Sequence, residues 1–169
     1  MKKTLTRCVP PQLETLTGFW LALCANGLLP WREDFSPRAL KPWLGNLALL
    51  EPVGLGGFRF RLCGTYLGRR FGSDTTGKQI ADLPIPLRAG LLDRLARAEA
   101  LQAPILARVK VGAGDEEIEF CELILPLSGR ATPARLLLLA AYPFAPATET
   151  SGALSTADST WAYDREAFI

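Results

Sequence analysis

Residues 104–144, with the sequence PILARVKVGAGDEEIEFCELILPLSGRATPARLLLLAAYPF, decide the fold. Apolar or alternating runs in this stretch are typical of β-strands, and breaks rich in Gly, Ser and Pro separate them. We expect strands at 104–111, 117–127 and 134–144. Successive strands joined by short turns predict an antiparallel sheet.

The residues before this stretch supply further strands and several helices. Runs at 47–52 and 58–63 flank the glycine-rich segment 53–57, which predicts a hairpin. Residues 10–27 form an amphipathic helix, because a proline pair opens the segment, apolar residues recur every three or four positions, and Asn26-Gly27 stops it. Shorter helices are expected at 36–43, 64–72 and 86–101. This element order predicts an α+β domain.

Composition excludes several function classes. The chain has 169 residues, 49% of them apolar, which fits one domain with a real core. Lys and Arg number 19 against 17 Asp and Glu, so no basic surplus indicates nucleic-acid binding. No histidine is present, which excludes Ser-His-Asp and Cys-His catalysis, histidine zinc sites and histidine-ligated haem.

Cysteines and hydropathy predict the compartment. Cys8, Cys24, Cys63 and Cys121 never approach a Cys-x-x-Cys spacing, so we expect reduced thiols and neither a disulfide nor a metal site. The basic start lacks the apolar run of a secretory leader, and no stretch reaches the ~18 apolar residues of a membrane span. We expect a cytoplasmic protein with an N-terminal arm (1–9), a domain (10–144) and a polar, disordered tail (145–169).

Strand pairing predicts which side chains share a face. Closing strand 104–111 onto strand 117–127 sets Arg108 opposite Glu119 and Lys110 opposite Glu117, and the first hairpin sets Glu51 opposite Arg59. We call the face that should receive the later helices the inner face. It is predicted to carry Phe58, Phe60, Leu62, Val109, Ile118, Phe120, Ile124, Leu138 and Tyr142.

The opposite, outer face is too apolar to remain in contact with water. Near its centre we expect Cys121, Leu123, Leu125, Leu137 and Leu139. Helix 10–27 is the available cover, from the same chain or from a partner subunit in a homodimer. Its contacting side chains are expected to be Leu16, Phe19, Trp20 and Leu23.

Four short blocks carry a family resemblance. They are Pro30-x-Arg32-x-Asp34-Phe35-x-Pro37, Phe58-Arg59-Phe60-Arg61-Leu62-Cys63-Gly64-Thr65, Gly72-x-Asp74-x-Thr76-Gly77-Lys78 and Glu122-x-x-Leu125-Pro126-Leu127-Ser128. In order and spacing the chain resembles the PAS domain family, in particular a bacterial single-domain group long labelled as a domain of unknown function.

The resemblance implies a five-stranded antiparallel sheet with helices on one face. It also implies a sensor of small molecules, cofactors, light or redox state, or a mediator of protein association, and it brings no established reaction. Without histidine the usual haem ligand is missing, and Cys63 at a strand end does not match the helical Asn-Cys-Arg-Phe setting of flavin photosensors. We therefore expect no haem and no photoactive flavin.

Candidate site residues lie on the predicted inner face. A ligand pocket could be walled by Phe58, Phe60, Leu62, Tyr66, Phe120, Glu122, Ile124 and Tyr142, or these side chains could fill the core completely. Glu122 among apolar neighbours must find a donor or lose solvation energy. It is either a ligand hook or a structural carboxylate bonded to backbone amides or to Arg32 or Arg61, and the structural role has the greater weight.

These observations favour a sensory or adaptor module in bacterial signal transduction. It would bind a small apolar ligand, an unknown protein partner, or both. The alternatives are a small enzyme with Glu122 as general base, and an interaction scaffold with a filled core. The sequence shows no paired catalytic constellation, so we do not expect an enzyme.

Overall fold

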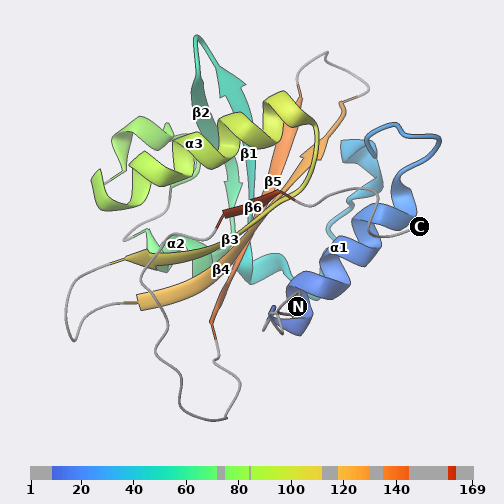
Figure 1. Cartoon of the computed structure of the whole chain (residues 1–169), viewed down its shortest axis with the longest axis horizontal. Helices are drawn as coiled ribbons and strands as arrows, with labels where there is room; N and C mark the ends of the chain where they lie inside the picture. Colours follow the sequence, from blue (N-terminus) through green and yellow to red (C-terminus); the bar gives the residue numbers. More distant parts are fainter. Residues whose placement is uncertain are drawn as a thin grey trace, which may run out of the picture.

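Strands of one antiparallel sheet form the centre of the molecule, in the order β2-β1-β5-β4-β3-β6 (Figure 1). The computed structural model describes residues 9–71, 75–83, 85–111, 118–129, 135–144 and the backbone of 160–162. The strands are β1 (Leu47–Val53), β2 (Gly57–Cys63), β3 (Ile105–Val111), β4 (Ile118–Leu127), β5 (Leu136–Pro143) and β6 (Thr160–Ala162). The α-helices are α1 (Pro11–Leu23), α2 (Thr65–Arg70) and α3 (Ile85–Leu101). The predicted α+β class is confirmed, and β1 to β5 form the predicted five-stranded antiparallel sheet, to which β6 adds a short sixth strand at the edge.

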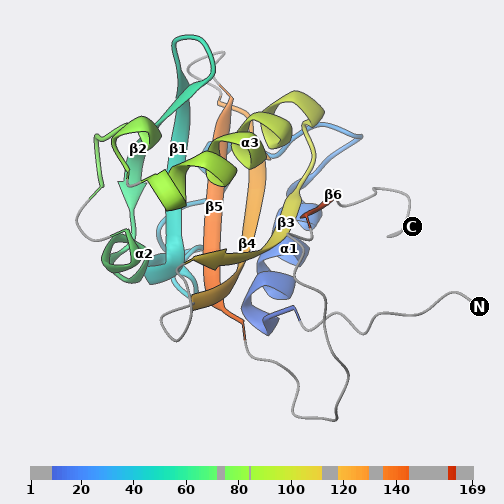
Figure 2. The same ribbon diagram turned by 60° about the vertical axis from the view of Figure 1, so that its left-hand side comes forward.

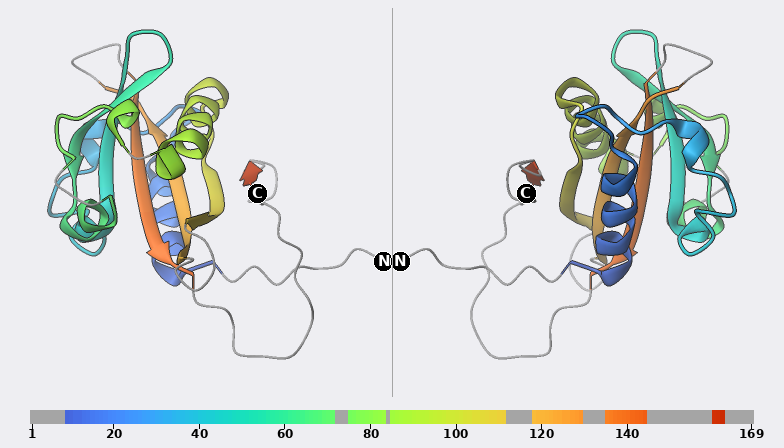
Figure 3. Two further views of the ribbon diagram at one scale, coloured as in Figure 1. Left: turned by 90° about the vertical axis from the view of Figure 1, so that its left-hand side faces the viewer. Right: turned by 90° about the vertical axis from the view of Figure 1, so that its right-hand side faces the viewer.

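Helices lie on both faces of the sheet. Figure 2 shows α3 in front of the sheet and α1 behind it, and the right-hand view of Figure 3 shows α1 lying over β4 and β5. The inner face is the one that packs against α2 and α3, and the outer face is the one that packs against α1. Each face therefore has its own apolar core, as the apolar character of the sheet requires.

Two helix predictions need correction. α1 ends at Leu23, before the predicted end at residue 27, because Asn26 and Gly27 have φ of 50° and 79° and form a tight turn instead. Segment 36–43 forms turns and no α-helix. The Ser36 hydroxyl accepts a hydrogen bond from the amide of Ala39, as an N-cap would, but Pro42 removes a donor and disfavours helical geometry at the residue before it.

The hairpin of β1 and β2 has the predicted pairing at its tip and a bulge further along. Glu51 pairs with Arg59, as predicted, but Leu49 pairs with Leu62, which leaves Arg61 as an extra residue. Because of the extra residue, the side chains after it point to the opposite face from the one predicted. Leu62 therefore lies on the outer face and is half-exposed, and its predicted place on the inner face is wrong. Cys63 packs against the inner core instead.

The pairing of β3 with β4 differs from the prediction by two residues. Lys110 pairs with Glu119 and Arg108 with Cys121, so the predicted register is wrong, although Arg108 and Glu119 still form the predicted ion pair, now as diagonal neighbours. The observed register sets Val109 against Phe120. Burial of such apolar pairs outweighs the small energy of exposed charge pairs. A register shift of two residues leaves each side chain on the face predicted for it, so most of the predicted inner-face positions on these two strands are correct.

The side chains of β5 point to the opposite faces from those predicted. Leu137 and Leu139 belong to the inner core, whereas Leu138 and Tyr142 belong to the outer core. Residues 136–141 are all apolar, and all are buried. A central strand covered on both faces has no alternation from which its register can be read.

Most of the predicted tail, 145–169, lies outside the described residues. Within it the backbone of Thr160–Ala162 forms β6, which pairs with β3 through Ile105, Leu106 and Ala107. At these three residues the structure has a strand where the sequence predicted disorder. The predicted arm at 1–9 is described only at Val9.

Candidate functional site

Glu122 lies on the inner face of β4 and is 3% exposed. Its cross-strand neighbours are Ala107 and Ala141, which are small enough to leave room for a carboxylate. The predictions that Glu122 is buried on this face and hydrogen-bonded are confirmed. Its donor is Arg94 of α3, and neither Arg32 nor Arg61 takes that role.

The bond between Arg94 and Glu122 is bidentate. Nε of Arg94 donates to Oε1 at 2.7 Å, and Nη2 donates to Oε2 at 3.3 Å. The Arg94 residue is 7% exposed, so both charges are removed from water. A fork of two parallel hydrogen bonds fixes the orientation of both groups and offsets their desolvation. The pair ties the helix layer directly to the sheet.

The helix sequence contains a signal for this partner that the sequence analysis missed. Leu91, Leu95 and Ala98 of α3 face the inner core, and Arg94 falls on the same stripe by its spacing of three and four residues. A cation on an apolar stripe requires a buried partner. Gly90, one turn earlier, makes room, because a Cβ there would lie 2.8 Å from Nη1 of Arg94.

Arg70, the last residue of α2, reaches the same face. Its guanidinium lies over the ring of Phe120, with 4.6 Å between Cζ and the ring centroid. Its Nη1 is buried and has no hydrogen-bond partner among the described residues. Burial lowers the pKa of Arg70, because an unpaired guanidinium is less stable away from water. Within the same described ranges, the hydroxyl of fully buried Thr75 also lacks a partner.

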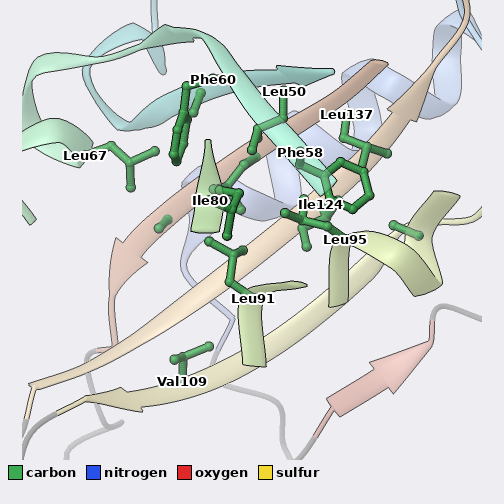
Figure 4. Close-up of a cluster of buried hydrophobic side chains, with 14 of the residues drawn as sticks. Leu50, Phe58, Phe60, Leu67, Ile80, Leu91, Leu95, Val109, Ile124 and Leu137 are labelled. Carbon is green, nitrogen blue, oxygen red and sulfur yellow. The ribbon is translucent and has the colours of Figure 1, made fainter. Parts of the chain in front are cut away.

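The residues of the predicted pocket do not all come together. The phenyl rings of Phe58, Phe60 and Phe120 lie in the inner core with Ile124, and Figure 4 shows part of this cluster. Tyr66 is mostly exposed, and its ring lies on Gly45. Leu62 is about half exposed. Tyr142 lies in the outer core. The sequence prediction is therefore wrong in grouping Leu62, Tyr66 and Tyr142 with the inner-face residues.

Aromatic side chains close the outer face. Trp20 of α1 is 2% exposed, and its indole Nε1 donates to the carbonyl of Pro126 in β4 at 2.9 Å. Phe19 packs edge-on against Phe35 and stacks on Trp43, with centroid distances of 5.3 and 5.9 Å. The prediction that this helix covers the outer sheet is confirmed. Its contact set includes Leu16, Phe19, Trp20, Leu23, Leu123 and Leu125, with Leu136, Leu138 and Ala140 where Leu137 and Leu139 were predicted.

The segment after α1 is tied to the end of β4. The amide of Arg32 donates to the carbonyl of Ser128 at 2.7 Å, and the amide of Ser128 donates to the carbonyl of Pro30 at 2.9 Å. The Arg32 guanidinium donates to the carbonyl of Phe35 at 2.9 Å. Two of the sequence blocks, 30–37 and 122–128, thus meet in space and hold the outer cover in place.

Comparison with known proteins identifies the family. Among the described residues, no helix is long and apolar enough to cross a membrane. No curated protein matches the chain. Among solved structures, the PAS domain of BvgS from Bordetella pertussis matches with 10% identity and a TM-score of 0.38, covering 79% of this chain and 90% of that one. The profile of a PAS domain family matches residues 9–140, which is most of the sequence, and this chain therefore belongs to the PAS domain family.

Proposed function

We propose that this protein is a sensory or adaptor module of bacterial signal transduction that acts in the cytoplasm by binding a small ligand, a protein partner, or both. Membership of the PAS domain family supports a signalling role. Within the structure, the buried pair of Arg94 and Glu122 carries the proposal, because it connects α3 to a central strand of the sheet.

A buried ion pair is suited to transmit a binding event. In a low dielectric environment the pair is either fully satisfied or strongly unfavourable, so intermediate arrangements are poorly populated. A polar group that enters between α3 and the sheet, or a partner that shifts α3, would compete for the same hydrogen bonds. The helix would then move relative to the sheet, and a partner could detect the change.

The alternative of an enzyme with Glu122 as general base is less favoured. Both carboxylate oxygens already accept hydrogen bonds from Arg94, so neither is directed at a substrate proton. A role in coupling α3 to the sheet, by contrast, requires both oxygens to be bound to Arg94, as they are in the structure. We also propose that the protein functions without haem or a photoactive flavin, and a visible absorption band in the purified protein would contradict this.

The proposal is tested by native mass spectrometry of the protein purified from its own host. The expected result is a species heavier than the 18.4-kDa chain, by the mass of a ligand or of a defined partner. Hydrogen exchange at α3 should then differ between the occupied and the empty protein, and Glu122→Gln should reduce that difference. The matched control is Glu51→Gln, on the other face, which should leave it unchanged. A bare chain whose α3 exchanges identically in host extract and in buffer would contradict the proposal.

A further inference from the structure

We propose that Arg70, lying over Phe120 on the inner face, binds the carboxylate of a small amphiphilic ligand whose apolar part rests on Ile118 and Val111. The inference rests on the proposed function, since it names the chemical class of ligand for the same face of the sheet. Three observations support it: a buried hydrogen-bond donor of Arg70 without an acceptor, an exposed apolar surface beside it, and a positive charge that no described carboxylate pairs with.

The orphaned donor is Nη1 of Arg70. Stacking on Phe120 holds the guanidinium in place at 4.6 Å from the ring centroid, yet this nitrogen is buried and finds no acceptor in the part of the chain that the structure describes. Buried donors are nearly always hydrogen-bonded, because leaving one unpaired loses its solvation without compensation. The rest of the side chain is partly exposed, so a ligand would meet the solvent-facing edge of the guanidinium first and would reach Nη1 only if the surrounding side chains shift.

The apolar surface lies next to Phe120 along the strand. Ile118 is two residues before Phe120 and so shares the inner face, but it is 56% exposed. Its cross-strand partner is Val111, which is partly buried and packs against the inner core. A large exposed side chain at the edge of a core is suited to contact an apolar ligand.

Charge favours an anion as the missing partner. Arg94, the buried cation of this face, is neutralised by Glu122 through two hydrogen bonds, whereas no carboxylate of the described residues pairs with Arg70. A guanidinium presents two parallel donors, which match the geometry of a carboxylate. Among small ligands, a carboxylate with a short alkyl chain satisfies both the cation and the exposed Ile118.

Arg69 provides a matched control. It precedes Arg70 in α2 and also lies over an aromatic ring, that of Tyr66, at 5.8 Å from the centroid. However, both Arg69 and Tyr66 are exposed. The two arginines therefore share helix, charge and stacking, and differ in burial and in the surface beside them.

The experiment compares hexanoate with 1-hexanol by titration calorimetry, using the wild type, Arg70→Met, Arg70→Lys and Arg69→Met. The wild type should bind hexanoate about tenfold more tightly than 1-hexanol, which corresponds to one charge-assisted hydrogen-bond pair. Arg70→Met should abolish this preference, Arg70→Lys should keep part of it, and Arg69→Met should keep all of it. Without ligand, Arg70→Met should melt no lower than the wild type, because Nη1 has no acceptor to lose among the described residues and the thioether can replace the guanidinium against the ring of Phe120.

Several results would overturn the inference. Equal binding of hexanoate and 1-hexanol would leave a ligand-binding protein without an anion site. Binding of neither probe would reject the site and leave the partner-binding form of the proposed function, which native mass spectrometry tests separately. Equal losses of preference in Arg69→Met and Arg70→Met would assign the effect to general charge. A lowered melting temperature of unliganded Arg70→Met would indicate that a protein group already pairs with Arg70.

Discussion

The two faces of the sheet bury similar apolar surfaces but treat polar groups differently. On the outer face, the buried indoles of Trp20 and Trp43 donate to the carbonyls of Pro126 and Gln12, and the other buried polar groups of the described residues, such as the hydroxyls of Thr17 and Tyr142, are uncharged. The inner face buries Arg94 and Glu122 and leaves part of Arg70 unpaired. The outer face is organised for stability. The inner face retains charged groups that an apolar core would not need.

Two glutamates, one on each face, show the same difference between the inner and the outer face. Glu122 is bound by a buried arginine, whereas Glu51 on the outer side of the β1–β2 hairpin is bound by Arg59 and Arg61, whose side chains are about half exposed. Exposed ion pairs contribute little to stability, but breaking a buried pair leaves an uncompensated charge in the core. Mutations at matched positions can therefore separate the two faces.

Trp20→Ala should have the largest effect. It removes the main aromatic contact of the outer face and leaves the Pro126 carbonyl unpaired, so the free energy of unfolding should fall by about 3–5 kcal/mol. Chemical denaturation measures the change. Trp20→Phe is the control, because it retains most of the ring and loses only the indole hydrogen bond, which should cost about 1–2 kcal/mol. Equal stability of Trp20→Ala and wild type would mean that α1 does not cover the sheet in solution.

Glu122→Ala should be nearly as destabilising. The substitution leaves the Arg94 guanidinium buried without its acceptor, and the expected loss is about 3 kcal/mol at neutral pH. The measurement is again the midpoint of urea unfolding. The double variant Glu122→Leu with Arg94→Met should recover much of this loss, since it removes both charges. A double variant as unstable as Glu122→Ala would contradict the view that the pair acts through charge.

Glu51→Ala should have a much smaller effect. Its partners Arg59 and Arg61 remain solvated, so the free energy of unfolding should fall by about 0.2–1 kcal/mol, and less at high salt. Comparing the salt dependence of Glu51→Ala and Glu122→Ala tests the contrast directly. If both variants responded equally to salt, the inner pair would be as solvated as the outer one.

Tyr142→Phe should be nearly neutral at pH 7 and informative at high pH. The Tyr142 hydroxyl is buried in the outer core, close to the side chain of Asn46. Burial raises the pKa of Tyr142, and Asn46 opposes that shift in part. A pKa raised by folding favours the protonated form, so stability is fully present below the unfolded-state pKa of about 10 and is lost as pH rises through the folded-state pKa.

The pH dependence of the free energy of unfolding between about pH 9 and 11 provides the measurement. The wild type should lose stability more steeply than Tyr142→Phe in this range. The control is Tyr66→Phe, because Tyr66 is mostly exposed. If Tyr66→Phe also removed the extra slope, the loss would not come from the outer core.

Local signals in the sequence were sufficient for most of the helices and strands and for the register at the tip of the first hairpin. The proline pair, the glycines of the first hairpin and the periodic leucines correctly predicted α1, β1, β2 and α3 to within a few residues. Gly54 and Gly56 adopt φ of 57° and 77°, which glycine tolerates, and so the tip of the first hairpin was readable. The burial of Glu122 was also predictable, because alternation along β4 placed it between Phe120 and Ile124.

Other features were set by tertiary packing. The face of each β5 residue depends on its neighbours, since Leu136–Ala141 carry no alternation and both faces are covered. The bulge at Arg61 moved Leu62 to the outer face through one extra residue that no local pattern marks. The partner of Glu122 required knowing that α3 crosses β4, because Arg94 is 28 residues away in the chain. Short-range sterics and periodicity act within a segment. The face that each strand residue occupies and the partners in a buried ion pair depend instead on the free energy of packing between segments.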